Sequence, residues 1–285
     1  MIIADLFHPA LDGSGALYTT DHFETVRRRL APGGVFCQWL PLYQLDLPSL
    51  RAIVRGFLEI YPGGSAWLNH YSVRTPMLAL IGPRDGGHLD LGALDARLRD
   101  PAVTPVARRL GFQTSMDLLG QYLGGPRALS AFAGQGPRNT DDYPFVTFDA
   151  RRNVQALTAP PWTLLRAVTQ ALQPDPAELL AEPTRDALNE RLAAYWRARN
   201  RFLDAGTALP GDPRGAALIE AASPGLLDAL RLSPDFDPAY GPLIGMARSL
   251  IASDRTAAAH LLRAINDAAP SRGEARELLS REFGQ

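Results

Sequence analysis

Two side chains near the start of the chain have the chemistry for proton transfer. Asp5 lies near the end of the apolar run 1–6, and His8 follows three residues later. The run has the length and composition of a buried parallel strand, and open α/β sheets bind ligands at the carboxyl ends of such strands. A carboxylate there can bind a cation or take a proton, and a histidine can act as a base near neutral pH. The alternatives are a loop acid or helix partner for Asp5 and a surface loop histidine for His8.

The other residues with catalytic potential show no catalytic pattern. Four further histidines are scattered without metal-ligand spacing: His22, His70, His88 and His260. Cys37 lies inside a buried strand pattern, which predicts a small core residue. Ser14 and Ser65 lie near glycines but lack the nucleophile-elbow pattern. The sequence therefore argues against metal, thiol and serine-hydrolase chemistry.

The first 81 residues carry the elements that would position these side chains. We expect strands at 1–6, 35–40, 66–71 and 77–81 and helices at 20–30 and 46–61. Thr20 and Asp46 can cap the two helices, and Pro-Gly-Gly sequences follow each of them. This order predicts a parallel α/β sheet closed by an antiparallel hairpin. Because a doubly wound sheet has about six strands, the sheet looks like the second half of one.

The rest of the chain is mainly helical in pattern. Residues 89–132 predict short helices broken by Gly and Pro, and 145–148 is a candidate extra strand. From 161 onward we expect helices at 186–203, 215–230, 238–252, 256–268 and 272–281. Ser233-Pro234 and Ala269-Pro270 lie 36 residues apart, and Ala239 and Ala275 keep this offset. The offset is near the tetratricopeptide period of about 34 residues, so the tail is either repeat-like or an ordinary helical bundle.

Composition narrows the class of protein. The 29 basic and 30 acidic residues of this 285-residue chain nearly cancel, and no basic stripe suggests nucleic acid as a partner. No Lys occurs, which excludes a Schiff-base or phosphate-loop lysine. A single cysteine, no apolar run of roughly 20 residues and no signal-like start predict a cytoplasmic chain without a membrane span.

Three segments in order resemble one family. They are the segment 2–9 with its continuation 13–19, the segment 30–43, and Asn139-Thr140-Asp141-Asp142-Tyr143-Pro144. Together they resemble the spermidine-synthase-like group of polyamine synthases, whose transferase domain has a class I S-adenosylmethionine fold. The resemblance covers about residues 1–150.

This resemblance implies roles for particular residues. It places Asp5 at the acid that ends the family's fourth strand, and His8 where aminopropyl transferases carry an acid before proline. It places Gln38, Trp39 and Tyr43 near the acceptor pocket, where Trp and Tyr suit an apolar wall; core packing is the alternative. Asp141 and Asp142 would close the site or form a turn, and we favour the turn.

Two departures from the family qualify the implied activity. Because a histidine does not attract a cation as a carboxylate does, His8 argues for an altered acceptor, a methyl transfer or lost activity. The family's Gly-rich turn and the acid for the ribose hydroxyls, which fix the nucleoside, are missing. We therefore expect a truncated reading frame or a decayed relative, with no identified donor-binding residues.

The sequence thus predicts a partial spermidine-synthase-like domain at 1–150 and a helical tail, tetratricopeptide-like or bundled, at 151–285. The expected function is aminopropyl or methyl transfer from S-adenosylmethionine or its decarboxylated form to a small amine, weak or absent in this chain alone. The alternative is a protein-interaction module built on the tail. Because a cut sheet exposes an apolar edge, we also expect a homo-oligomer or a poorly soluble chain.

Overall fold

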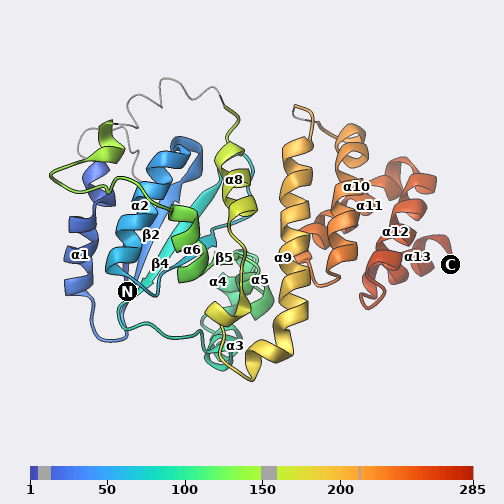
Figure 1. Ribbon diagram of the computed structural model, residues 1–285. Helices are drawn as coiled ribbons and strands as arrows, with labels where there is room; N and C mark the ends of the chain where they lie inside the picture. The colour runs from blue at the N-terminus through green and yellow to red at the C-terminus, as the bar shows by residue number, and fades with distance from the viewer. Residues whose placement is uncertain (6–13, 149–158, 212, 285) are drawn as a thin grey trace. The chain divides into compact units, whose positions relative to one another are not determined.

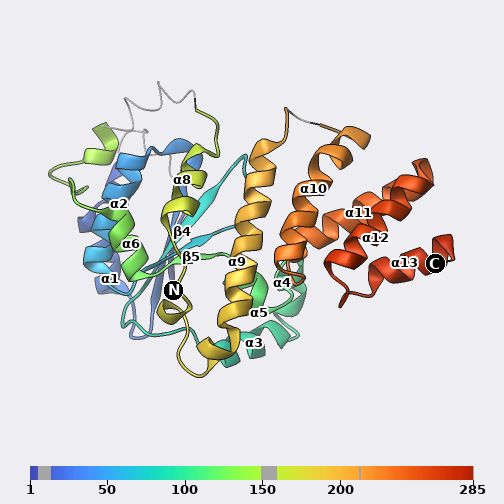
Figure 2. The ribbon, with the colours of Figure 1, turned by 45° about the vertical axis from the view of Figure 1, so that its right-hand side comes forward.

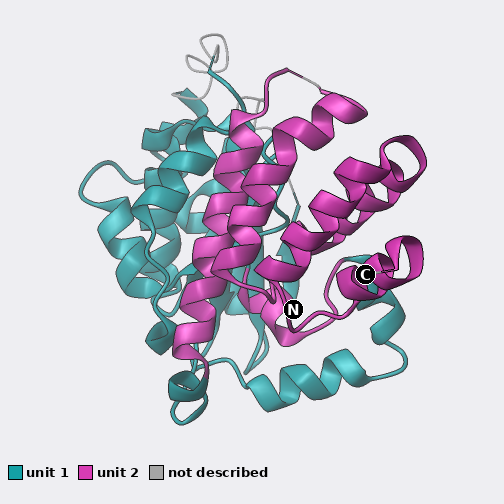
Figure 3. Cartoon of the chain, turned by 90° about the vertical axis from the view of Figure 1, so that its right-hand side faces the viewer, with its two compact units in different colours: residues 1–110, 121–187 teal, residues 111–120, 188–285 magenta. Residues whose placement is uncertain are grey.

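The computed structural model describes residues 1–5, 14–148, 159–211 and 213–284, so His8 lies outside the described residues. The chain forms two compact units, coloured separately in Figure 3. The first combines residues 1–110 with 121–187, and the second combines residues 111–120 with 188–285. Each unit is described by itself below.

The first unit is built on a five-stranded mixed sheet of order β1-β2-β4-β3-β5 (Figure 1). Its strands are β1 (Ile2–Ala4), β2 (Val35–Pro41), β3 (Ser65–Leu68), β4 (Met77–Pro83) and β5 (Tyr122–Gly124). β1 and β2 are parallel, and the other neighbours are antiparallel. The α/β class and the closing hairpin are confirmed, with β4 inserted between β2 and β3.

Two helices follow the first two strands, close to the predicted bounds. α1 (Thr20–Arg29) is capped by Thr19, whose hydroxyl accepts the His22 N–H, so the predicted cap at Thr20 was one residue late. α2 (Leu47–Ile60) is capped by Asp46 as expected, because the Asp46 carboxylate accepts the Ser49 N–H at 2.8 Å. Side-chain capping therefore fixes where both helices begin.

An aromatic cluster joins these helices to one face of the sheet. Phe36 of β2 packs against Phe23 of α1 and Phe57 of α2, with ring centroids 6.1 and 6.2 Å apart. Tyr61 stacks on Phe36 at 5.7 Å. Gly82 of β4 lies under these rings, and a Cβ there would come within 2.5 Å of the Tyr61 ring. A larger residue at 82 would push the sheet off the cluster.

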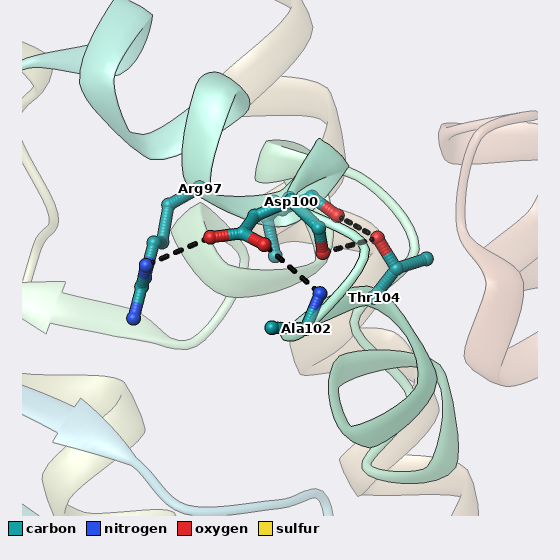
Figure 4. A network of polar contacts seen from close by, with 5 residues as sticks. Arg97, Asp100, Ala102 and Thr104 are labelled. Atoms are coloured by element: carbon teal, nitrogen blue, oxygen red, sulfur yellow. Dashed lines mark hydrogen bonds and ion pairs between the residues drawn. The ribbon is translucent and has the colours of Figure 1, made fainter.

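Short helices occupy most of 91–133, as expected. They are α3 (Leu91–Arg99), α4 (Thr104–Arg109), α5 (Ser115–Leu119) and α6 (Pro126–Ala133). The α3–α4 corner is held by Asp100, whose carboxylate binds Arg97 and accepts the Ala102 N–H, both at 2.9 Å (Figure 4). The Thr104 hydroxyl donates to the Asp100 carbonyl at 3.0 Å. This polar network therefore has a structural role, which is to hold the turn between α3 and α4.

Two elements differ from the expectations. β5 lies in a stretch predicted as helical, and it exists because Trp67 and Ala66 of β3 pair with Tyr122 and Gly124. The candidate strand 145–148 is helical. The Asn139 side chain accepts the Val146 N–H at 3.0 Å, which uses a backbone donor that a strand would need.

Further along the chain, helices match the predicted positions closely. The first unit ends with α8 (Thr163–Ala171), the 3₁₀ helix η3 (Pro176–Glu178) and the start of α9 (Thr184–Ala208). The second unit adds α10 (Ala216–Leu232), α11 (Asp237–Ser253), α12 (Arg255–Ala268) and α13 (Glu274–Phe283) (Figure 2). None of the helices in the described ranges is long and apolar enough for a bilayer crossing.

Three side chains on α9 hold the segment 111–120 within the second unit. Tyr195 donates to the Asp117 carboxylate at 3.3 Å, and the Trp196 indole donates to the Leu119 carbonyl at 2.9 Å. Arg199 is fully buried and donates to the Gly120 carbonyl at 2.9 Å. A segment far away in sequence therefore completes the core of the helical unit.

Candidate functional site

The carboxyl ends of the parallel strands β1 and β2 lie side by side at one end of the sheet. The two strands run parallel, with Ala4 beside Gln38. Asp5 follows β1 directly and is exposed, while β2 continues through Trp39. The structure therefore brings Asp5, Gln38 and Trp39 to the same end of neighbouring strands, where open α/β sheets bind ligands.

Gln38 is the most unusual polar residue at this edge. Its side chain is fully buried, and it lies on the same sheet face as Phe36 because side chains alternate along a strand. Its amide nitrogen donates to the Trp39 carbonyl at 3.1 Å, but its side-chain oxygen has no hydrogen-bond partner among the described residues. A buried carbonyl without a donor costs about 1–3 kcal/mol, which makes this oxygen an unusual feature of the sheet. Trp39 lies on the opposite face and is half-buried.

An apolar pocket lies just beyond β2. It has a volume of about 300 Å³ and is lined by Tyr43 and Asp46, by residues 159–161, and by Leu164 and Ala167 of α8. The Asp46 carboxylate is engaged as a helix cap. Tyr43 therefore supplies a phenol to a wall that is otherwise mainly apolar, as in many small-molecule pockets.

The segment 139–146 is tied to the residues between β1 and α1. The buried Asn139 amide donates to the carbonyls of Gly15 and Tyr18, at 3.3 and 2.9 Å. The Thr19 hydroxyl donates to the Asp141 carboxylate at 2.7 Å. Both segments lie at one end of the sheet in Figures 1 and 2. In this clamp, defined as residues 139–146 bound to 15–21, Asp141 acts as a structural acceptor.

His22 lies beside this clamp and was not singled out as a site residue from the sequence. Burial lowers its pKa, and the nearby Asp141 carboxylate partly opposes that shift. Its ring packs edge-on to Phe36 at 6.3 Å, and its Nε2 is buried without a hydrogen-bond partner in the part of the chain that the structure describes. The sequence signal that could have found it is its place three residues after the capping Thr19.

Asp142 and Tyr143 are exposed, with Tyr143 showing 66% of its surface. Cys37 is buried, and desolvation raises the pKa of its thiol to about 11, which makes it a poor nucleophile at neutral pH. Within the described ranges, no three His, Cys, Asp or Glu side chains gather as a metal-binding group.

The fold and this edge define an α/β protein with a mixed sheet and a separate helical unit. Comparison of the chain with protein-family models gives no match, and comparison with curated proteins and with solved structures gives none either. The function therefore has to be argued from the site itself.

Proposed function

We propose that this chain is a spermidine-synthase-like transferase that binds a small amine at the carboxyl ends of β1 and β2. The reaction is transfer of an aminopropyl or methyl group from a donor of the S-adenosylmethionine type. This proposal implies that the sheet is the second half of a Rossmann-like sheet of the class I methyltransferase type.

One observation carries the proposal. The three segments that resemble the family meet in space, although more than 100 residues separate the first from the third. β1 pairs with β2 through Ala4 and Gln38, and the clamp joins Asn139 to Gly15 and Tyr18. Segments that resemble the motifs of one family and contact one another in space support a shared binding function.

The chemistry follows from the side chains at that edge. The amine nitrogen attacks the donor carbon, a new N–C bond forms, the C–S bond breaks and a thioether leaves. The surplus N–H proton passes to Asp5, with His8 assisting. The Gln38 oxygen accepts an amine N–H, and Tyr43 covers the alkyl part of the acceptor. Catalysis then rests mainly on holding the nitrogen in line with the donor carbon.

The donor side of the reaction is weaker in this chain. Its sequence lacks the Gly-rich turn and the acid that would fix a nucleoside. We therefore expect the 285-residue chain to bind the acceptor but to bind the donor poorly or not at all.

The test is a titration with 1,4-diaminobutane followed by ligand-observed NMR. We expect saturable binding that weakens about tenfold in Tyr43→Ala and in Asp5→Asn. The matched controls are Leu110→Ala and Asp267→Asn, two exposed positions outside the clamp and outside the Tyr43 pocket. Binding that is unchanged in both site variants, or absent altogether, would overturn the proposal. Methyl- and aminopropyl-transfer assays with both donors then measure activity directly.

A second candidate is a protein-interaction module on the helical unit. Ser233 and Ala269, which lie 36 residues apart, are the C-caps of α10 and α12, and Ala239 and Ala275 are buried in the first turns of α11 and α13. The offset therefore relates two successive helix pairs, as in a repeat. Arg255 lines a surface pocket of the helical unit together with His260 and Arg263, so a pull-down with the full chain and with Arg255→Ala tests this reading. A partner lost with the variant supports it, and a pull-down unaffected by the variant counts against it.

A further inference from the structure

A second cavity lies at the other end of β2, where the strand begins. It has a volume of about 270 Å³. Val35 of β2, Ile81 of β4 and Trp67 of β3 line it. Strand register and alternation place these three side chains on the sheet face opposite Phe36. The cavity thus has an apolar floor with an indole at its side, separate from the pocket at Tyr43.

The walls of this cavity come from two loops that are bonded in place. The Leu89 N–H donates to the Leu179 carbonyl at 2.9 Å, which joins the loop after β4 to the end of η3. The Gly33 N–H donates to the Asp85 carboxylate at 2.6 Å. Gly87, with φ of 122°, turns the first loop around the cavity in a conformation that favours glycine. Hydrogen bonds to the backbone therefore hold both loops that form the walls of the cavity.

The charged groups around the cavity are mainly carboxylates. Glu178 is nearly buried, with 6% of its side chain exposed, and Asp85 has 56% exposed. The Arg127 guanidinium serves two carboxylates, with Nε 3.4 Å from Glu178 and Nη2 2.6 Å from Asp175. Arg84 lies 4.0 Å from Asp85 at the rim, and His88 is exposed in the lining.

The same carboxylates affect the pKa of a neighbouring tyrosine, Tyr122. The pKa of Tyr122 is raised by burial first and then by the Glu178 and Asp175 carboxylates, with Arg127 opposing them. Trp67 packs edge-on to the Tyr122 ring with centroids 5.1 Å apart. The aromatic wall and the carboxylates therefore belong to one local environment.

We propose that this cavity binds a small organic cation of the alkylammonium class. The indole of Trp67 attracts a cation over its face, Glu178 and Asp85 supply negative charge, and Val35 and Ile81 accept the alkyl groups. A metal ion is the poorer match, because the lining holds no metal-binding group among the described residues. An anion would meet two carboxylates. This site is additional to the acceptor site at Tyr43 and does not depend on it.

The test uses choline as the probe and 3,3-dimethylbutan-1-ol as its neutral isostere. Each gives one nine-proton methyl signal, so saturation-transfer NMR compares the two directly on the full chain. We expect saturable binding of choline and at least about tenfold weaker binding of the neutral alcohol. Equal binding of the two probes would mean that the cavity is merely apolar and would overturn the proposal.

Variants locate the response. Trp67→Phe and Glu178→Gln should each weaken choline binding about tenfold, since they remove the indole and the buried charge. Trp162→Phe and Glu190→Gln are the matched controls. Asp85→Asn is a second charge variant that keeps an acceptor for the Gly33 N–H and serves if Glu178→Gln fails to fold by circular dichroism. Choline binding that is unchanged in Trp67→Phe and in the folded charge variant overturns the assignment. Tyr43→Ala should leave choline binding unchanged, which separates this site from the proposed acceptor site.

Discussion

The side-chain amide of Asn139 donates a hydrogen bond to the carbonyl of Tyr18 at 2.9 Å, although 121 residues separate the two. Tyr18 and Asn139 are both fully buried. The same Asn139 side chain accepts the Val146 N–H at 3.0 Å. The Asn139 side chain therefore joins the two segments of the clamp, as a donor to Tyr18 and as an acceptor from Val146.

Replacing Asn139 by Leu should destabilise the first unit by about 3 kcal/mol, because it leaves buried carbonyls and an N–H without partners. Urea unfolding followed by circular dichroism measures this change. Asn189→Leu, on the exposed surface of α9, is the control and should change the free energy of unfolding by no more than about 0.5 kcal/mol. Equal effects of the two variants would show that the clamp is unimportant for stability.

Gln38→Met should separate stability from function. The substitution removes a buried carbonyl that has no described donor, so we expect a free energy of unfolding unchanged or raised by about 1 kcal/mol. It also removes the proposed acceptor for the amine, so diaminobutane binding should fall. Gln170→Met, at an exposed position, should change neither quantity. A clear loss of stability in Gln38→Met would mean that the Gln38 hydrogen bond to the Trp39 carbonyl outweighs the cost of the unpartnered oxygen.

The depressed pKa of His22 predicts a pH dependence of stability. The folded pKa lies below the ordinary value of 6.5, so the unfolded chain takes up the proton first as pH falls. The contribution of His22 is therefore fully present above about pH 6.5 and is lost as the pH falls below it.

Unfolding curves between pH 7.5 and 5.5 should show a shallower loss of stability in His22→Gln than in the unmodified chain. His260→Gln, on the exposed surface of α12, should keep the original slope. Identical slopes for all three proteins would contradict the role assigned to His22.

Arg199→Lys should weaken the second unit. Lysine has no planar fork to reach the Gly120 carbonyl and Asn200 together, so a buried polar contact is lost at a cost of about 2 kcal/mol. Thermal unfolding measures the effect, and hydrogen exchange should show 111–120 opening first. The exposed Arg197→Lys on the same helix is the control, and a similar loss there would refute the assignment.

Self-association should depend on the edge strand β1. β1 lies at one edge of the sheet, and its Ile3 side chain is 55% exposed. Ile3→Lys should reduce oligomers in light scattering, because charge on an edge strand opposes edge-to-edge pairing. Val106→Lys changes an equally exposed apolar residue on α4 and should leave the mass unaltered. A monomeric unmodified chain would count against the predicted oligomer.

The sequence by itself determined the elements whose signals are local. The Asp46 cap, the Pro-Gly-Gly stops and the helices of the tail follow from side chains within a few residues of each other. The parallel β1–β2 pair and the closing hairpin followed from the order of these elements.

Tertiary structure decided whatever depends on distant partners. β5 is three residues long and exists through pairing with β3, so its own sequence shows no alternation of apolar and polar residues that would predict a strand. Phe145–Phe148 has the composition of a strand but is helical, with the Val146 N–H taken by Asn139. The buried Gln38 oxygen, the burial of His22 and the cavity at Trp67 likewise arise from packing between segments, which residue spacing along the chain does not encode.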